Sequence, residues 1–212
     1  MNGTVAAGIV RMMANRQVLP VAGMRVIDGP NPVTPYFDKY FSELARLFDA
    51  VAADDLIAAA EVIEAASSAG RKTIVVGNGG SAGIASHVAV DLVKAAGRRA
   101  VTFHDPALIT CYANDYGYGN WVAEAMNSYA DPGDVAVLIS SSGQSENIVN
   151  GAKAASEIGL STITLSGFEE SNPLRSMGEV NLWVDSCVYN EVEITHQVWL
   201  LAIVDYLIEQ DR

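Results

Sequence analysis

The sequence predicts a doubly wound α/β domain, and three observations carry that prediction. Five short, continuous runs rich in β-branched residues follow one another, as in parallel strands buried on both faces. Segments of helical periodicity separate these runs. Loops rich in Gly or Ser lead from two of the strands into helices. The expected strands are 73–77, 99–103, 134–140, 161–167 and 180–185.

Helices are expected before, between and after these strands. Apolar residues recur at helical spacing from Pro35 to Val51, and a second helix follows the candidate cap Asp54 and ends at Gly70. Both carry wide apolar faces that suit packing against a sheet or another subunit. The other expected helices are 82–96, 107–128, 146–158, a short piece after Pro173, and 191–209. A flavodoxin-like strand order fits this layout, but the sequence alone leaves the order open.

Length and composition narrow the possible functions. The 212 residues suit one domain at 35–212, preceded by an arm at 1–34 that Gly and Pro interrupt and in which 24–27 could form a strand. The formal net charge of −12 and the lack of a basic stripe argue against a nucleic-acid partner. Two Cys form no disulfide framework, and no apolar run is long enough for a membrane span. We therefore expect a cytoplasmic protein.

The first candidate ligand loop is VVGNGGSAG at 75–83, where a strand passes into a helix. Its glycines allow close backbone approach, and the N–H groups at a helix start favour an anion. The glycine spacing is neither GxGxxG nor a Walker loop, so no nucleotide cofactor is expected.

The second candidate loop is LISSSGQSEN at 138–147, which places four hydroxyl side chains directly after a buried strand. Ser hydroxyls can donate to phosphate oxygens while the following helix supplies backbone N–H groups. Ser145 could instead simply cap that helix. Both loops lie at the carboxyl ends of strands, where open α/β sheets bind ligands. The pattern therefore favours a phosphate site.

Together, GNGGS at 77–81, ANDYGYG at 113–119 and ISSSGQSEN at 139–147 resemble the SIS (sugar isomerase) domain family, and within it the phosphoheptose isomerases. The resemblance covers about 36–208. It implies a three-layer sandwich with a five-stranded parallel sheet and N-terminal helices for oligomer packing. It also implies a homotetramer with active sites between subunits. The substrate-binding residues that it implies are Asn78, Gly79, Gly80, Ser81, Asn114, Asp115, Ser140, Ser141, Ser142 and Ser145.

Two pairs of ionisable residues are spaced so that both members share a helix face. His87 and Asp91 are four residues apart, and Glu193 and His196 are three apart in the last helix. Each pair suits metal ligation or acid–base catalysis. The resemblance implies site roles for His87, Asp91 and Glu193, whereas His196 matches a family His that is not the catalytic one and is a candidate by its spacing from Glu193 alone. The candidate catalytic residues are therefore Asp91, Glu193 and His196, and the candidate zinc ligands are His87, Asp91, Glu193 and His196.

The chain departs from the family pattern at three of the matching positions. Asp91 stands where the family has the longer Glu, Glu193 stands where Gln is usual, and Leu201 stands where the family has a His ligand. Losing a methylene withdraws the carboxylate, and a misplacement of about 1 Å can cost roughly a hundredfold in rate. Either these residues re-form a site with changed geometry, or the chain only binds a phosphosugar.

Three further residue types are expected to be structural. We expect Trp121, Trp183 and Trp199 in the core or an interface, Cys111 buried rather than nucleophilic, and His104 in a loop role.

The expected function is that of a phosphosugar isomerase acting on sedoheptulose 7-phosphate, whose heptose product feeds surface-polysaccharide synthesis. Asp91 would move the proton between C1 and C2, with Glu193 and His196 as partner acid–base groups or metal ligands. The alternative is a non-catalytic SIS protein that binds a phosphosugar or serves as an adaptor, for example for a replication initiator. Leu201 favours the alternative, and the two carboxylates favour the enzyme.

Overall fold

The sheet has five parallel strands, and each overlaps a predicted β-branched run. The computed structural model describes residues 34–212, so the predicted arm and the strand at 24–27 lie outside the described residues. The strands are β1 (Thr73–Gly77), β2 (Ala100–Val101), β3 (Val135–Ser140), β4 (Ser161–Ser166) and β5 (Val180–Trp183). Their order is β2-β1-β3-β4-β5 with every neighbouring pair parallel, which is the flavodoxin-like order.

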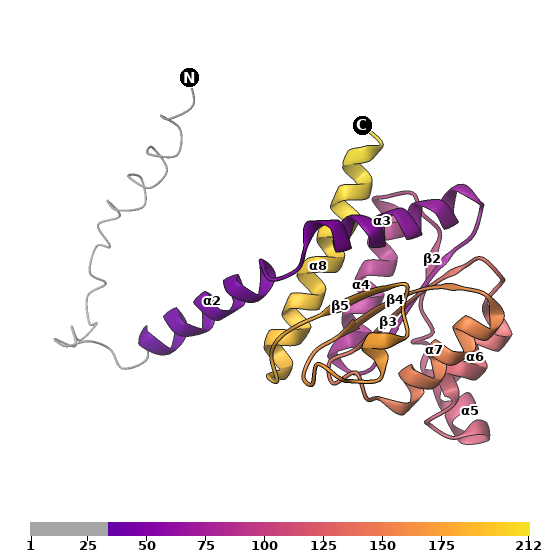
Figure 1. Ribbon diagram of the computed structural model, residues 1–212. Coiled ribbons are helices and arrows are strands. Elements are labelled where there is room, and N and C mark those ends of the chain that lie inside the picture. The colour runs from indigo at the N-terminus through magenta and orange to yellow at the C-terminus, as the bar shows by residue number, and fades with distance from the viewer. Residues whose placement is uncertain (1–33) are drawn as a thin grey trace, which may run out of the picture. The chain divides into compact units, whose positions relative to one another are not determined.

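Helices cover both faces of the sheet and make it the middle of three layers (Figure 1). One face carries α3 (Ala53–Ser68), α4 (Gly80–Lys94) and α8 (Tyr189–Gln210). The other carries α5 (Pro106–Tyr116), α6 (Trp121–Tyr129) and α7 (Glu146–Ile158). Two further elements are α2 (Thr34–Phe48) and the short helix η1 (Leu174–Ser176). This confirms the predicted fold class.

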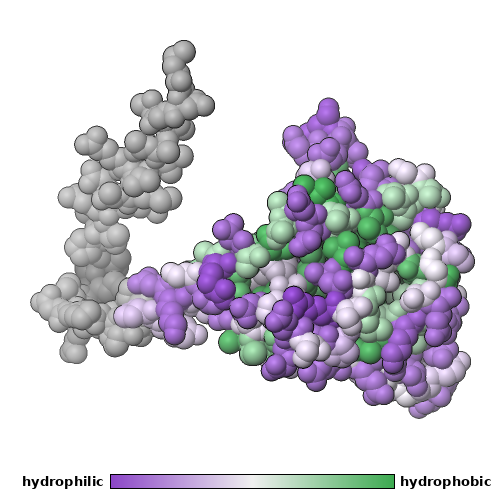
Figure 2. Space-filling model, viewed as in Figure 1, coloured by the Kyte–Doolittle hydropathy of each residue, from purple (hydrophilic) through white to green (hydrophobic). Residues whose placement is uncertain are grey.

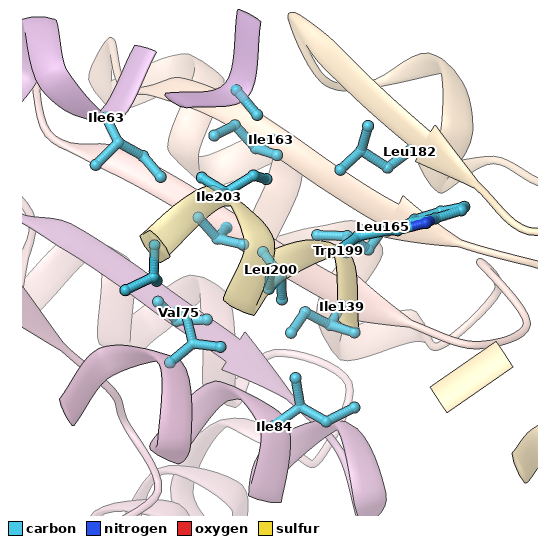
Figure 3. Packing of buried hydrophobic residues seen from close by; sticks show 14 of the residues in the cluster. Ile63, Val75, Ile84, Ile139, Ile163, Leu165, Leu182, Trp199, Leu200 and Ile203 are labelled. Atoms are coloured by element: carbon cyan, nitrogen blue, oxygen red, sulfur yellow. The ribbon is translucent and has the colours of Figure 1, made fainter. Parts of the chain in front are cut away.

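Strand side chains alternate between two apolar cores. Val75 and Val137 face the layer of α3, α4 and α8, whereas Ile74 and Val76 face the layer of α6 and α7. In Figure 3, Trp199 and neighbouring α8 side chains converge on residues from the central strands. The α8 helix is therefore anchored by burial against the sheet, which places its first turns beside the carboxyl ends of the strands.

Three local predictions are corrected. The helix predicted at 107–128 is two helices, because Gly117 takes a φ of +82° that ends α5. Asp54 lies inside the first turn of α3, whose cap position is Ala52. Cys111 is exposed, since α5 is a peripheral helix that contains no buried residue.

Residues 40–212 form one compact unit, and this unit begins inside α2. The domain boundary between 34 and 35 therefore stays a prediction. Among residues 34–212, no helix combines the length and the apolar character that a membrane crossing requires.

Candidate functional site

A polar cavity of about 100 Å³ lies at the carboxyl ends of β1 and β3. The strand order reverses between these two strands, and ligands bind at such switch points in open α/β sheets. The cavity is lined by Asn78, Ser81, Ile139, Ser140, Ser141, Ser142, Ser145, Tyr189 and Glu193. The fold therefore brings both predicted ligand loops and the start of α8 to one place.

The serine loop, which is the second candidate loop LISSSGQSEN at 138–147, leaves the N-terminus of α7 without a side-chain cap. Ser145 occupies the cap position, but its hydroxyl makes no capping bond to the helix backbone. Instead, Ser140 Oγ donates to Ser145 Oγ at 3.1 Å. Ser142 Oγ accepts from the backbone N–H of Gln144 at 3.2 Å. A helix start with adjacent hydroxyls and no side-chain cap is suited to an anion.

The turn of the serine loop depends on Gly143, whose φ is +64°. A Cβ at this position would overlap the side-chain amide of Asn172. Asn172 is 3% exposed, and its Nδ2 donates to Ser166 Oγ and to the carbonyls of Gly167 and Glu169. The loop that follows β4 therefore fixes the shape of the serine loop.

Gly143→Ala should destabilise the protein and weaken phosphate binding, because it adds an L side chain at positive φ and displaces Asn172. The backbone conformation alone costs about 1–2 kcal/mol. Gly97→Ala is a matched control, since Gly97 has a φ of +67° with nothing within 4 Å of its added Cβ. Thermal unfolding and titration with inorganic phosphate measure both effects. Equal stability and affinity for the two variants would contradict a special role for the Asn172 contact.

The Gly-rich loop, VVGNGGSAG at 75–83, lets the Glu193 carboxylate of α8 lie close over the start of α4. Gly79 has a φ of +55°, and a Cβ at Gly80 would overlap Glu193 Oε2. Any side chain at Gly80 would therefore displace the carboxylate. Because a carboxylate already faces this helix start, a phosphate is better placed at the start of α7.

The ANDYGYG segment contributes less directly than predicted. Asn114 and Asp115 are exposed on α5 and do not line the cavity, and Asn114 Nδ2 donates to Asp115 Oδ1 at 2.8 Å. The link to the cavity comes from Tyr118, whose hydroxyl donates to Asn78 Oδ1 at 3.2 Å.

His87 and Asp91 form a pair on the outer side of α4. His87 Nε2 lies 3.1 Å from Asp91 Oδ2, and the two side chains are 46% and 34% exposed. Gln197 of α8 donates from Nε2 to His87 Nδ1 at 3.1 Å. Both ring nitrogens of His87 therefore have partners, and neither residue of the pair lines the cavity.

The structure separates His196 from the other candidate catalytic residues. Its side chain is fully buried, and Nε2 donates to the carbonyl of Ser166 at 3.0 Å. Within the described chain, Nδ1 is buried with no hydrogen-bond partner. Burial lowers the pKa of His196 to about 4, so the ring is neutral at physiological pH.

The predicted four-residue zinc site is not brought together. Among residues 34–212, no group of three or more His, Cys, Asp or Glu side chains is placed to hold a metal ion. Catalytic zinc generally takes three protein ligands, and His87 with Asp91 supplies two. Leu201 packs against the apolar core where the resemblance implies a second His. The donor set therefore does not fit that zinc site.

Four polar or aromatic residues at or near the cavity, besides the apolar Ile139 that lines it, were not predicted as part of the site. Tyr189 lines the cavity, with its ring centroid 4.8 Å from that of Phe168. Asn147 and Tyr118 bond to Asn78, and His104 Nε2 donates to the carbonyl of Gly77 at 3.0 Å. Asn147 and Tyr118 belong to the quoted motifs, so their positions next to the loops were a usable signal.

The fold and the cavity define an α/β protein with a polar ligand site at the switch point of its sheet. The chain belongs to the SIS domain family, whose model matches residues 36–167. This confirms the resemblance noted in the sequence.

Relatives agree in name and in structure. The chain is 36% identical to the probable phosphoheptose isomerase of Thermoplasma acidophilum, over 79% of this chain and 96% of that protein. It is 33% identical to the phosphoheptose isomerase of Syntrophotalea carbinolica, over 79% and 90%. The solved phosphoheptose isomerase of Neisseria gonorrhoeae has a TM-score of 0.75 and 25% identity, covering 82% of this chain and 99% of that one.

Proposed function

We propose that this protein is an aldose–ketose isomerase that converts sedoheptulose 7-phosphate into a heptose 7-phosphate. The observation that carries the proposal is that one cavity holds both the serine loop and the Glu193 carboxylate. Relatives named phosphoheptose isomerase support the choice of substrate. The product would serve as a precursor of surface polysaccharide, and the reaction would take place in the cytoplasm.

The phosphate is assigned to the serine loop. Ser141, Ser142 and Ser145 supply hydroxyl donors, Ser140 supports Ser145 by donating to its Oγ, and the start of α7 supplies backbone N–H groups. Asn78 and Ser81 line the same cavity and would contact sugar oxygens. Asn114 and Asp115 on α5 would reach only the outer part of a bound sugar.

Glu193 is the proposed base. It would take a proton from C1 of the open-chain ketose, while O2 accepts a proton from the His87–Asp91 relay and the C2 carbonyl becomes the hydroxyl of an enediol. Transfer of the C1 proton from Glu193 to C2, while the O1 proton passes back to the relay, gives the aldose. By the helix rise of about 1.5 Å per residue, Asp91 lies about 16 Å beyond Gly80 along α4. Asp91 and Glu193 of one chain therefore do not serve the same carbon.

The remaining candidates take other roles. The pair of His87 and Asp91 is exposed and would relay hydroxyl protons where a second subunit covers it. His196 is buried against Ser166 and is assigned no contact with substrate. No step is assigned to zinc, because the donor set does not fit it.

Self-association into a homotetramer is part of the proposal. Exposed apolar side chains lie on α4 at Val90 and Val93, and on α8 at Ile194 and Val198. Figure 2 shows hydrophobic side chains gathered over the region of α3 and α8 within a largely hydrophilic surface. Apolar surface of this kind is typical of subunit contacts.

Leu201 supports a second candidate function, phosphosugar binding without catalysis, as in an adaptor. Its side chain packs on the core at a position where the family pattern has a His, so one acid–base group is missing. On this view the serine loop would still bind a phosphosugar.

An isomerase assay with purified protein and sedoheptulose 7-phosphate tests the proposal. We expect turnover that survives chelation and is not raised by added Zn²⁺. Loss of turnover on chelation, with recovery on adding Zn²⁺, would contradict the metal-free assignment. No turnover with this or shorter ketose phosphates, alongside thermal stabilisation by them, would favour the binding protein.

A further inference from the structure

Asn78 and Asn147 form a two-way amide pair between the two ligand loops. Asn78 Nδ2 donates to Asn147 Oδ1 at 2.9 Å, and Asn147 Nδ2 donates to Asn78 Oδ1 at 2.9 Å. Asn147 is 2% exposed, on the first turn of α7. The Tyr118 hydroxyl adds a second donor to Asn78 Oδ1 at 3.2 Å. One amide thus connects three segments that are far apart in the sequence.

These bonds determine what Asn78 can offer to a ligand. An amide oxygen accepts two hydrogen bonds and an amide nitrogen donates two. The Asn78 oxygen already receives both of its bonds, whereas its nitrogen uses one of two hydrogens. Asn78 lines the cavity and Asn147 does not. The free capacity of Asn78 is therefore a single N–H donor.

We propose that Asn147 is a positioning residue, which orients the Asn78 amide so that an N–H donates to an oxygen of the bound phosphosugar. The inference rests on the proposed function for the identity of the ligand. Without Asn147, the Asn78 amide could turn and present its oxygen, which would repel a sugar or phosphate oxygen. The Tyr118 hydroxyl, in the turn between α5 and α6, favours the same orientation because it donates to Asn78 Oδ1.

Asn147→Asp tests this proposal, because an ionised carboxylate accepts from Asn78 Nδ2 but cannot donate to Asn78 Oδ1. Burial should raise the pKa of the new carboxyl group, and its protonated form regains a donor. We expect the dissociation constant for sedoheptulose 7-phosphate, measured by calorimetry, to rise about tenfold at pH 8 and to recover as the pH falls to 6. Asn127→Asp on α6 is the control, because Asn127 is exposed and its substitution adds the same charge to the protein.

A purely structural role would give a different result. Weak binding at every pH, without recovery, would overturn the proposal, and so would wild-type affinity at every pH. If Asn147→Asp fails to fold, Tyr118→Phe replaces it, because Tyr118 is 57% exposed. That variant should bind about threefold more weakly, by loss of one hydrogen bond. Unchanged affinity would then overturn the proposal.

The two hypotheses fail in distinguishable ways. Binding of sedoheptulose 7-phosphate without turnover would remove the proposed isomerase activity and leave the role of Asn147 testable by affinity. Turnover of sedoheptulose 7-phosphate, together with an affinity of the Asn147→Asp variant that does not change with pH, would support the isomerase activity and overturn the role of Asn147. A wild-type protein that binds no phosphosugar would overturn both.

Discussion

Glu193→Gln should lower the turnover of sedoheptulose 7-phosphate by about 10²–10⁴-fold, the usual contribution of a general base. Gln has nearly the same size and keeps the contact over Gly80, but its amide cannot take the C1 proton. The Michaelis constant should change little, because the serine loop that is assigned to the phosphate is untouched. Steady-state kinetics at saturating substrate measure the effect.

Glu191→Gln is the matched control for this prediction. Glu191 lies on the same helix and accepts from Ser186 Oγ at 2.6 Å, a bond that the Gln oxygen can keep. Glu191 does not line the cavity, so its replacement should leave turnover unchanged. If Asp91→Asn abolished turnover while Glu193→Gln retained it, the base would be Asp91, as the sequence pattern suggested.

The position of the site could be predicted because parallel strands bring their carboxyl ends to one edge. GNGGS follows β1 and ISSSGQSEN follows β3, and these strands are neighbours in the sheet. Buried β-branched runs are a strong local signal, so each strand was located to within three residues at either end. The order of the strands is set by packing and was confirmed only by the structure.

The environment of individual side chains could not be predicted in the same way. Glu193 and His196 are three residues apart and were expected to share a site. The α8 helix is covered on more than one side, so Glu193 reaches the cavity while His196 turns into the core. Similarly, Cys111 was expected to be buried, but α5 packs at the edge of the fold and contains no buried residue. Helical spacing predicts which side chains point in a similar direction, but it does not predict how deeply each side chain is buried.

Acid should destabilise this protein through His196. Burial lowers the folded-state pKa of His196 to about 4, whereas an unfolded histidine titrates near its ordinary pKa of 6.5. Below pH 6.5 the unfolded state therefore binds a proton that the folded state does not, and the free energy of unfolding falls. The loss grows as the pH drops from 6.5 to 4 and reaches about 3 kcal/mol. His104, whose pKa burial also lowers, acts in the same direction.

His196→Gln separates this effect from the titration of carboxylates. Gln keeps an N–H that can donate to the Ser166 carbonyl but does not titrate, so the variant should lose less stability between pH 7 and pH 5 than the wild type. Between pH 7 and pH 5 the wild type should lose about 2 kcal/mol more free energy of unfolding than the variant, measured by urea unfolding at each pH. Carboxylates and His104 titrate in both proteins and cancel in the comparison. Parallel curves would show that His196 takes up its proton without unfolding, and the ring would then be accessible to solvent and available for catalysis after all.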